Sequence, residues 1–213
     1  LRHSSAASDV YKRQIICDEY KYLWQGIGKA DSIVFNPHKW LGAQFDCSVH
    51  FLKDMNVQKN TLSLTPEYLK TSGVEGITNL SDYTIPLGRR FRALKLWFLI
   101  RSEGLSGIRK LIRDHINWSE ELFHKIKLLK NIEVITEPVL GLFTFRFINQ
   151  NSENINELNE KIVKEINDEG LIYLTPTKVG EKFVIRFMAG TLEMEENDID
   201  VAYECIKKKS ERM

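Results

Sequence analysis

The side chains best suited to chemistry lie together in residues 36–40, NPHKW. The short apolar run 33–35 precedes them and predicts a buried strand, which should end at Pro37 because proline cannot donate to a sheet ladder. Lys39 is therefore expected on a turn, between a histidine and an aromatic ring. A lysine held against apolar surroundings can lose its proton and become a nucleophile, the chemistry needed for a Schiff base with pyridoxal phosphate. On spacing alone, an ordinary solvated lysine remains the alternative.

The elements around this lysine are those expected at the end of an α/β domain. Residues 47–53 (CSVHFLK) alternate, with Val49 and Phe51 on one side, and predict a half-buried second strand. Lys39 would then lie on the turn between two strands. Residues 54–84 show little apolar periodicity and are rich in Asn, Gly and Ser. A loop of this length inside a compact protein is usually functional or mobile.

The helices expected before and after this segment follow from apolar spacing. Residues 15–27 carry apolar and aromatic side chains at helical intervals. A long helix is expected over residues 86–104, stopping at Gly104, and a second amphipathic helix over 105–130. Three arginines near the start of the long helix are unfavourable at a positive helix N-terminus, so they should have acidic or anionic partners. They are Arg89, Arg90 and Arg92.

The remainder alternates strands and helices and predicts a small α+β unit with antiparallel strands and helices on one face. A helix is expected from about residue 152 to 169, ending at Gly170. The last helix has acidic residues at its start and lysines at its end, the order that the helix dipole favours. Strands are expected at 132–136, 141–147, 171–175 and 182–187.

Composition bounds the class of protein without identifying it. The 213 residues are 43% hydrophobic and 28% charged, ordinary values for a globular protein. A net charge of +1 gives no field that would favour nucleic acid or an anionic membrane. Three widely spaced cysteines argue against a disulfide framework, show no metal-ligand spacing and suit the cytoplasm, where we expect the protein to be. The sequence contains no apolar run of transmembrane length.

The amino-acid sequence around Lys39 is a more specific signal than the position of the lysine after a strand. NPHKW followed by FDCS (45–48) resembles the cofactor-lysine segment of the group II pyridoxal-phosphate-dependent decarboxylases. Within that family it looks most like the aromatic-L-amino-acid decarboxylase branch, which includes DOPA, tyrosine and tryptophan decarboxylases. The resemblance continues through LTPEYLK (64–70) and IPLGRRFRALKLWF (85–98), and more weakly to VIRF (184–187). It covers roughly residues 15 to 210.

The resemblance implies an activity and roles for particular residues. Lys39 would hold pyridoxal 5'-phosphate as a Schiff base, and an aromatic L-amino acid would be decarboxylated to its amine and carbon dioxide. Tyr68, on a mobile catalytic loop, would protonate the carbanion carbon after carbon dioxide leaves, and a tyrosine there favours simple decarboxylation over the oxidative, aldehyde-forming variant. His38 and Asn36 would lie against the cofactor phosphate. Weaker candidates for the substrate pocket are Trp40, Phe45, Gly88 and Arg186.

The resemblance also implies the fold and the division of the chain. The expected fold class is α/β: the end of the large domain of a fold-type I pyridoxal-phosphate enzyme, followed by a small α+β C-terminal domain. Residues 15–92 would form the large-domain part with its mobile loop, and residues 93–213 the C-terminal domain. Residues 1–14 match neither and are interpreted as a non-native or disordered head. The full-length relatives are expected to be homodimers.

Part of the family pattern has no counterpart in this sequence. Members of the family are more than twice this length, and the part upstream carries most of the parallel sheet and the aspartate that pairs with the pyridine nitrogen. Asp9 stands near the expected place of that aspartate, but its neighbours do not match. We therefore expect a C-terminal fragment that is nearly inactive by itself.

Two other functions stay open at this point. A decarboxylase of glutamate or another amino acid shares the NPHK wording, although HKW with FDCS fits the aromatic branch better. A non-catalytic C-terminal module that packs against a partner chain is the second alternative. A long loop that carries the Tyr68 wording argues against a pure scaffold.

Overall fold

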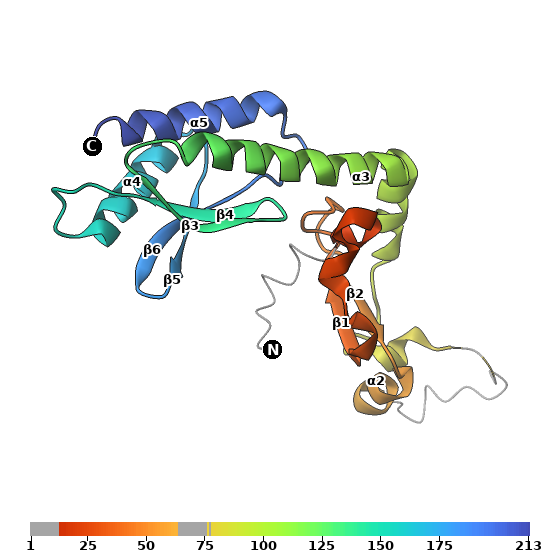
Figure 1. The fold of residues 1–213 in the computed structure, drawn as a ribbon. Coiled ribbons are helices and arrows are strands. Elements are labelled where there is room, and N and C mark those ends of the chain that lie inside the picture. Colours follow the sequence, from red (N-terminus) through yellow and green to blue (C-terminus); the bar gives the residue numbers. More distant parts are fainter. Residues whose placement is uncertain (1–12, 64–75, 77) are drawn as a thin grey trace. The chain divides into compact units, whose positions relative to one another are not determined.

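The computed structural model describes residues 13–63, 76 and 78–213, which form two compact units. The first unit ends at Gly104, and the second is Leu105–Met213. The sequence placed the boundary before residue 93, whereas this division falls after Gly104. Tyr68 lies outside the described residues. Figure 1 shows the elements of each unit.

The first unit is built around a two-stranded antiparallel sheet. Strands β1 (Ser32–Phe35) and β2 (Val49–Leu52) pair with Ile33 opposite Phe51 and Phe35 opposite Val49. The expected strands are thus confirmed, and Lys39 lies on the connection between them. The expected burial is wrong, because Val34 is 43% exposed and Phe51 57% exposed. Within the described chain this sheet has no third strand.

Short helices flank this sheet. Three 3-10 helices precede β1 where helical spacing was predicted, namely η1 (Arg13–Ile16), η2 (Asp18–Trp24) and η3 (Ile27–Lys29). The prediction of irregular structure throughout 54–84 is wrong at its start, where helix α2 (Met55–Leu62) forms. Asp54 caps α2, its side chain accepting from the backbone N–H of Asn56 at 2.9 Å. A last short helix, η5, covers Leu80–Tyr83.

Helix α3 spans Ala93–Ile126 and is interrupted at Gly104. Gly104 has φ 65° and ψ 168°, a backbone conformation open to glycine and costly for other residues. The helix stop predicted at this glycine is therefore confirmed in the backbone. The long helix begins later than the sequence suggested, since residues 86–92 are not helical.

The second unit is a four-stranded antiparallel sheet covered by helices (Figure 1). Its strand order is β3-β4-β6-β5, so β3 and β5 are the edge strands. The strands are β3 (Ile132–Val139), β4 (Leu142–Phe147), β5 (Thr175–Val179) and β6 (Lys182–Met188). Helices α4 (Ile155–Glu169) and α5 (Glu196–Ser210) complete the unit. The prediction of a strand at 171–175 is wrong in position, because the observed strand β5 begins only at Thr175. It contains Pro176, which is tolerated because β5 is an edge strand.

The core of the second unit lies between the sheet and its helices. Phe143, Phe145 and Phe147 alternate along β4 and are fully buried. They belong to one cluster with buried apolar residues of α3, α4, β6 and α5. This confirms the predicted alternation and the α+β architecture. At about 25 cal/mol per Å² of apolar surface removed from water, such aromatic side chains supply much of the driving force for folding.

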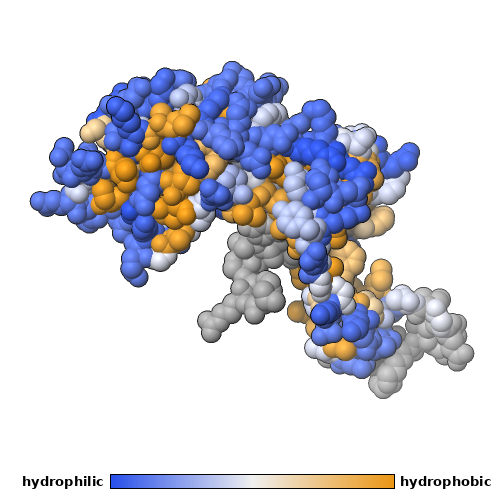
Figure 2. Space-filling model, viewed as in Figure 1, coloured by the Kyte–Doolittle hydropathy of each residue, from blue (hydrophilic) through white to orange (hydrophobic). Residues whose placement is uncertain are grey.

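The surface of both units shows apolar residues among the hydrophilic ones (Figure 2). In the first unit the exposed aromatic side chains include Phe45, Phe91 and Phe98. None of the helices in the described ranges is long and apolar enough to cross a membrane.

Candidate functional site

Lys39 lies on a hydrogen-bonded turn between β1 and β2. The Lys39 N–H donates to Asn36 O at 3.1 Å, and the Gly42 N–H donates to Lys39 O at 2.9 Å. The Ala43 N–H donates to Pro37 O at 2.9 Å, closing the turn on itself. Trp40, which follows the lysine, is buried, whereas Lys39 itself is exposed. The turn therefore presents the lysine outward on a backbone that its own hydrogen bonds define.

His38 is held through one ring nitrogen by the backbone of Cys47. The N–H of Cys47 lies 3.0 Å from Nδ1, and Cys47 O lies 2.6 Å from the same nitrogen. Only one of these contacts is a hydrogen bond at a time, depending on whether Nδ1 carries a proton. The His38 ring also meets the ring of Phe45 edge-on, with centroids 4.9 Å apart. Nε2 is thus the ring nitrogen that a ligand would meet.

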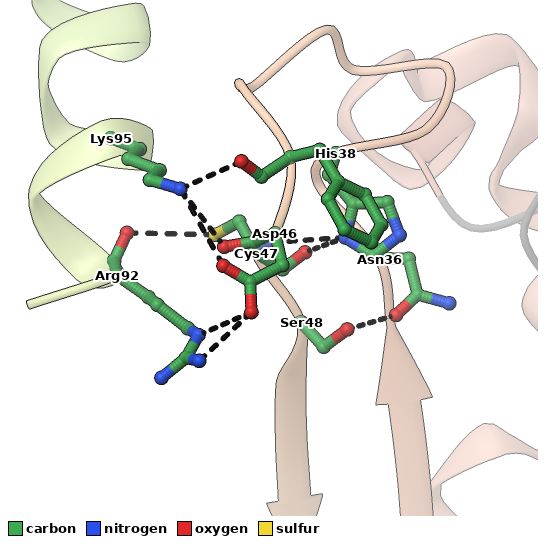
Figure 3. A network of polar contacts seen from close by, with 8 residues as sticks. Asn36, His38, Asp46, Cys47, Ser48, Arg92 and Lys95 are labelled. Carbon is green, nitrogen blue, oxygen red and sulfur yellow. Dashed lines mark hydrogen bonds and ion pairs between the residues drawn. The ribbon is translucent and has the colours of Figure 1, made fainter. Parts of the chain in front are cut away.

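Asn36 is tied to the strand that follows the turn. Ser48 Oγ donates to Asn36 Oδ1 at 2.5 Å, across the two ends of the turn (Figure 3). Because Asn36 also accepts the Lys39 N–H through its backbone, it fixes both the entry and the exit of the turn.

Asp46 connects the turn to the start of α3, as Figure 3 shows. Its Oδ2 accepts from Arg92 Nε at 2.9 Å and lies 2.8 Å from Arg92 Nη2. Lys95 Nζ donates to the carbonyl oxygens of Phe45 at 2.9 Å and Asp46 at 3.3 Å, and lies 3.6 Å from Asp46 Oδ1. The hydrogen bond from Arg92 is the main cause that lowers the pKa of Asp46 to about 2. The carboxylate is therefore ionised throughout the physiological range.

Cys47 completes the connection to α3. Its side chain is 2% exposed, and its Sγ lies 3.6 Å from Arg92 O. Burial raises the pKa of this thiol, which keeps it protonated and able to donate. Cys47 thus contacts His38 through its backbone and α3 through its side chain.

The structure brings together some of the predicted site residues and separates others. Asn36, His38 and Lys39 share one turn, as expected, with Trp40 buried beside them. The apolar surroundings expected for Lys39 are not formed by the described residues, since Lys39 is exposed.

The weaker candidates have different surroundings. Phe45 is 77% exposed and touches His38. Gly88 is exposed, and a Cβ added there would meet nothing within 4 Å. Arg186 belongs to the second unit, on β6 opposite Thr144 and Thr175. The roles assigned to these residues stay predictions.

Sequence reasoning missed Asp46, although a signal for it was present. The arginines before α3 required an anionic partner, and the structure identifies that partner for Arg92 as Asp46. Asp46 stands in the FDCS segment that carried the resemblance, but a spacing of 46 positions in the chain hides the pairing.

A pocket of about 600 Å³ opens beside the same segment. It is lined by residues 42–44 of the turn and by α3 residues that include Leu94, Lys95 and Phe98. Neither Lys39 nor His38 lines it.

Comparison with known proteins gives a consistent result. Residues 12–148 match the pyridoxal-dependent decarboxylase conserved domain. The aromatic-L-amino-acid decarboxylase of Mus musculus is 39% identical over 193 residues, which are 90% of this chain and 39% of the mouse protein. The crystal structure of Oryza sativa TDC with PLP and tryptamine superposes with a TM-score of 0.86 at 31% identity, over 92% of this chain and 42% of the rice chain.

A third similar structure is that of Rhodiola rosea 4-hydroxyphenylacetaldehyde synthase. It has a TM-score of 0.81 and 25% identity, and the match covers 92% of this chain and 40% of that chain. This chain therefore spans about two fifths of the length of the relatives it matches. The predicted fold, that of a fold-type I pyridoxal-phosphate enzyme, is confirmed by these likenesses. The family match covers most of the chain, and the chain belongs to the pyridoxal-dependent decarboxylase family.

Proposed function

We propose that the protein is a pyridoxal-phosphate-dependent decarboxylase that converts an aromatic L-amino acid to its amine and carbon dioxide. The observation that carries this proposal is the Lys39 turn: a lysine on a backbone fixed by its own hydrogen bonds, inside the segment that matches the family. Because the chain spans about two fifths of its relatives, the activity is proposed for the whole protein.

The residues of the turn fit the cofactor. Lys39 supplies a primary amine, which in its neutral form can form a Schiff base with an aldehyde. His38, held through Nδ1, can donate from Nε2 to a phosphate oxygen when it is protonated there. Pyridoxal phosphate, when bound, supplies the electron sink for the electron pair left as carbon dioxide departs. The buried Trp40 and the turn's own hydrogen bonds keep the lysine in place.

The names of similar proteins favour an aromatic substrate. The resemblance of the sequence to the family favours a homodimer for the whole protein. The similar proteins include one named for aromatic L-amino acids and one solved with tryptamine. A substrate panel of DOPA, tryptophan and glutamate, with the released amine measured, separates the aromatic branch from an acidic amino acid decarboxylase. Light scattering on the whole protein tests the dimer.

The binding experiment isolates Lys39. The purified chain is mixed with pyridoxal phosphate, reduced with borohydride, and digested for peptide mass analysis. The cofactor should be found on Lys39 and be absent from Lys39→Ala. Lys29→Ala removes another exposed lysine of the same unit and should leave the labelling of Lys39 unchanged. Labelling spread evenly over surface lysines would contradict the proposal and favour the non-catalytic module.

An aldehyde-forming reaction is the second candidate, because one similar structure is an aldehyde synthase. Tyr68, which lies outside the described residues, favours the simple decarboxylation. The whole protein should release amine without hydrogen peroxide, and formation of peroxide with an aldehyde would support the second candidate instead.

A further inference from the structure

We propose that Asp46 is a positioning residue for the cofactor lysine: anchored by Arg92 and Lys95 on α3, it fixes the turn that presents Lys39. This inference rests on the proposed function and concerns how the chain's own residues support it. Asp46, Arg92 and Lys95 do not touch the lysine amine in the contacts described above; they act through the backbone between them and the turn.

The connection can be followed from one contact to the next. Arg92 approaches one carboxylate oxygen of Asp46 with two of its nitrogens, at 2.9 and 2.8 Å. The next residue, Cys47, holds His38 through its backbone, and His38 is the direct neighbour of Lys39. Figure 3 shows these contacts from Arg92 to His38. The position of this end of α3 is thereby transmitted to the neighbour of the lysine over a short chain of contacts within the first unit.

Lys95 makes this a three-point attachment. Its Nζ donates to two successive carbonyl oxygens, those of Phe45 and Asp46, and also lies near the Asp46 carboxylate. Two backbone groups and one side chain of the turn are therefore fixed by one α3 residue. An ordinary surface ion pair holds only two flexible side chains, which is why such pairs contribute little.

The attachment is also partly shielded from water. The side chains of Arg92, Lys95 and Asp46 are 29%, 23% and 35% exposed. A second ion pair in the same unit, between Lys53 and Asp31, is more exposed and longer: its side chains are 69% and 89% exposed, and its charged atoms are 3.8 Å apart. Asp31→Asn is thus a matched control for Asp46→Asn, since both remove one carboxylate charge from the same unit.

Positioning errors are costly for a covalent reaction, because a small displacement of the reacting atom removes much of the benefit of a fixed geometry. In Asp46→Asn, we expect the rate of borohydride-trapped labelling at Lys39 to fall by about tenfold. Asp46→Glu keeps the charge and should retain most of the wild-type rate. Asp31→Asn should label at the wild-type rate.

A double-mutant cycle tests whether Asp46 and Arg92 act as one unit. Arg92→Met should slow the labelling about as much as Asp46→Asn, and the double variant should be no slower than either single variant, because the same attachment is lost each time. Effects that multiply in the double variant would show independent roles and overturn the proposal.

Amide hydrogen exchange gives a readout that does not need the cofactor. In Asp46→Asn, exchange should accelerate in peptides that cover residues 38–47, while peptides from the second unit stay unchanged. Unchanged exchange at 38–47 would overturn the proposal whether or not the cofactor binds. Wild-type chain that fails to label at Lys39 would instead contradict the proposed function, and labelling of Asp46→Asn at the wild-type rate would contradict only the positioning role.

Discussion

Gly141 lies in the hairpin between β3 and β4, against helix α3. Its φ is +81°, and the residue before it, Leu140, also has a positive φ of 54°. A Cβ built on Gly141 would lie 3.1 Å from Ser119 Oγ and 3.3 Å from the backbone of α3 at His115 and Ile116. Glycine is therefore required here twice, for its conformation and for its lack of a side chain.

Replacing Gly141 with alanine should destabilise the second unit by about 2–4 kcal/mol, because the strained φ and the overpacking add. Gly180→Ala is the matched control: Gly180 also has a positive φ, +59°, but an added Cβ would meet nothing within 4 Å. We expect a cost of about 1 kcal/mol there. Urea unfolding followed by circular dichroism measures both, and equal costs would show that the contact with α3 is unimportant.

At the scale of single residues, the sequence indicated which residue types could do chemistry but not which distant residues they contact. The place of Lys39 on a connection between two strands could be predicted, because the apolar run before it ends at Asn36 and Pro37. Asp46 could not, since its role depends on Arg92 and Lys95, which only the folded chain brings close. The exposure of Lys39 was also unpredictable, because the burial of a residue depends on what packs against it and not on the residues beside it in the sequence.

Helices α4 and α5 are joined by a lysine that is almost completely buried. Lys209 Nζ, on a side chain 6% exposed, lies 2.8 Å from both Glu165 and Glu169 of α4. Burial disfavours the charged lysine, but the hydrogen bonds to the two carboxylates outweigh it and raise its pKa above 10.5. The hydrogen bond from Lys209 likewise lowers the pKa of Glu169 below 4.5. Both shifts favour the charged pair in the folded state.

The sign of each shift sets a pH window for this contribution. The raised pKa of Lys209 stabilises the fold below about pH 10.5 and is lost as the pH rises further; the lowered pKa of Glu169 stabilises it above about pH 4.5 and is lost as the pH falls. Lys209→Met should cost about 1–2 kcal/mol between these limits and less outside them.

The control for that variant is Lys164→Met, whose partner Asp168 lies one turn along the same helix. Their side chains are 77% and 64% exposed, so solvent screens the pair and we expect little or no loss of stability. Urea unfolding of the three proteins from pH 4 to pH 11 compares them. A cost of Lys209→Met that does not change across this range would refute the ionic origin.

Asparagines on α4 explain why element boundaries were harder to predict than elements. The buried Asn159 accepts from the Phe147 N–H and donates to Phe147 O, both at 2.8 Å, and so occupies the place of a neighbouring strand. Asn167 does the same for the backbone of Leu174 at 2.8 and 3.0 Å. Leu174 is thereby bound to a side chain and not to a sheet, which is why the strand expected at 171–175 starts only at Thr175. The sequence does not reveal that an asparagine on a helix will bind the backbone of a distant residue.

The two units differ in how much core each contains. Among the described residues, the buried apolar side chains of the first unit are few, namely Cys17, Pro37, Trp40, Leu41, Ala43 and Cys47. The large cluster around the phenylalanines of β4 lies entirely in the second unit. The stability of the chain is therefore concentrated after Gly104.

Residues 105–213 expressed alone should fold. We expect a cooperative thermal transition with a midpoint within a few degrees of the main transition of the full chain, because the core cluster is retained intact. Residues 1–104 alone should unfold without a comparable transition. Differential scanning calorimetry measures both, and a noncooperative transition for residues 105–213 would mean that this unit depends on the first.

The two edge strands of the second unit bear on how the chain behaves at high concentration. Unpaired backbone groups at a sheet edge can template pairing with another molecule. Both edge strands contain residues that oppose such pairing: β3 contains Glu137 and Pro138, and β5 contains Pro176 and Lys178. A proline lacks the N–H that an added strand would need, and a charge resists burial between molecules. Neither edge of the sheet therefore favours the addition of a strand from another molecule. We expect this to protect the second unit, which contains most of the chain's hydrophobic core, from aggregation.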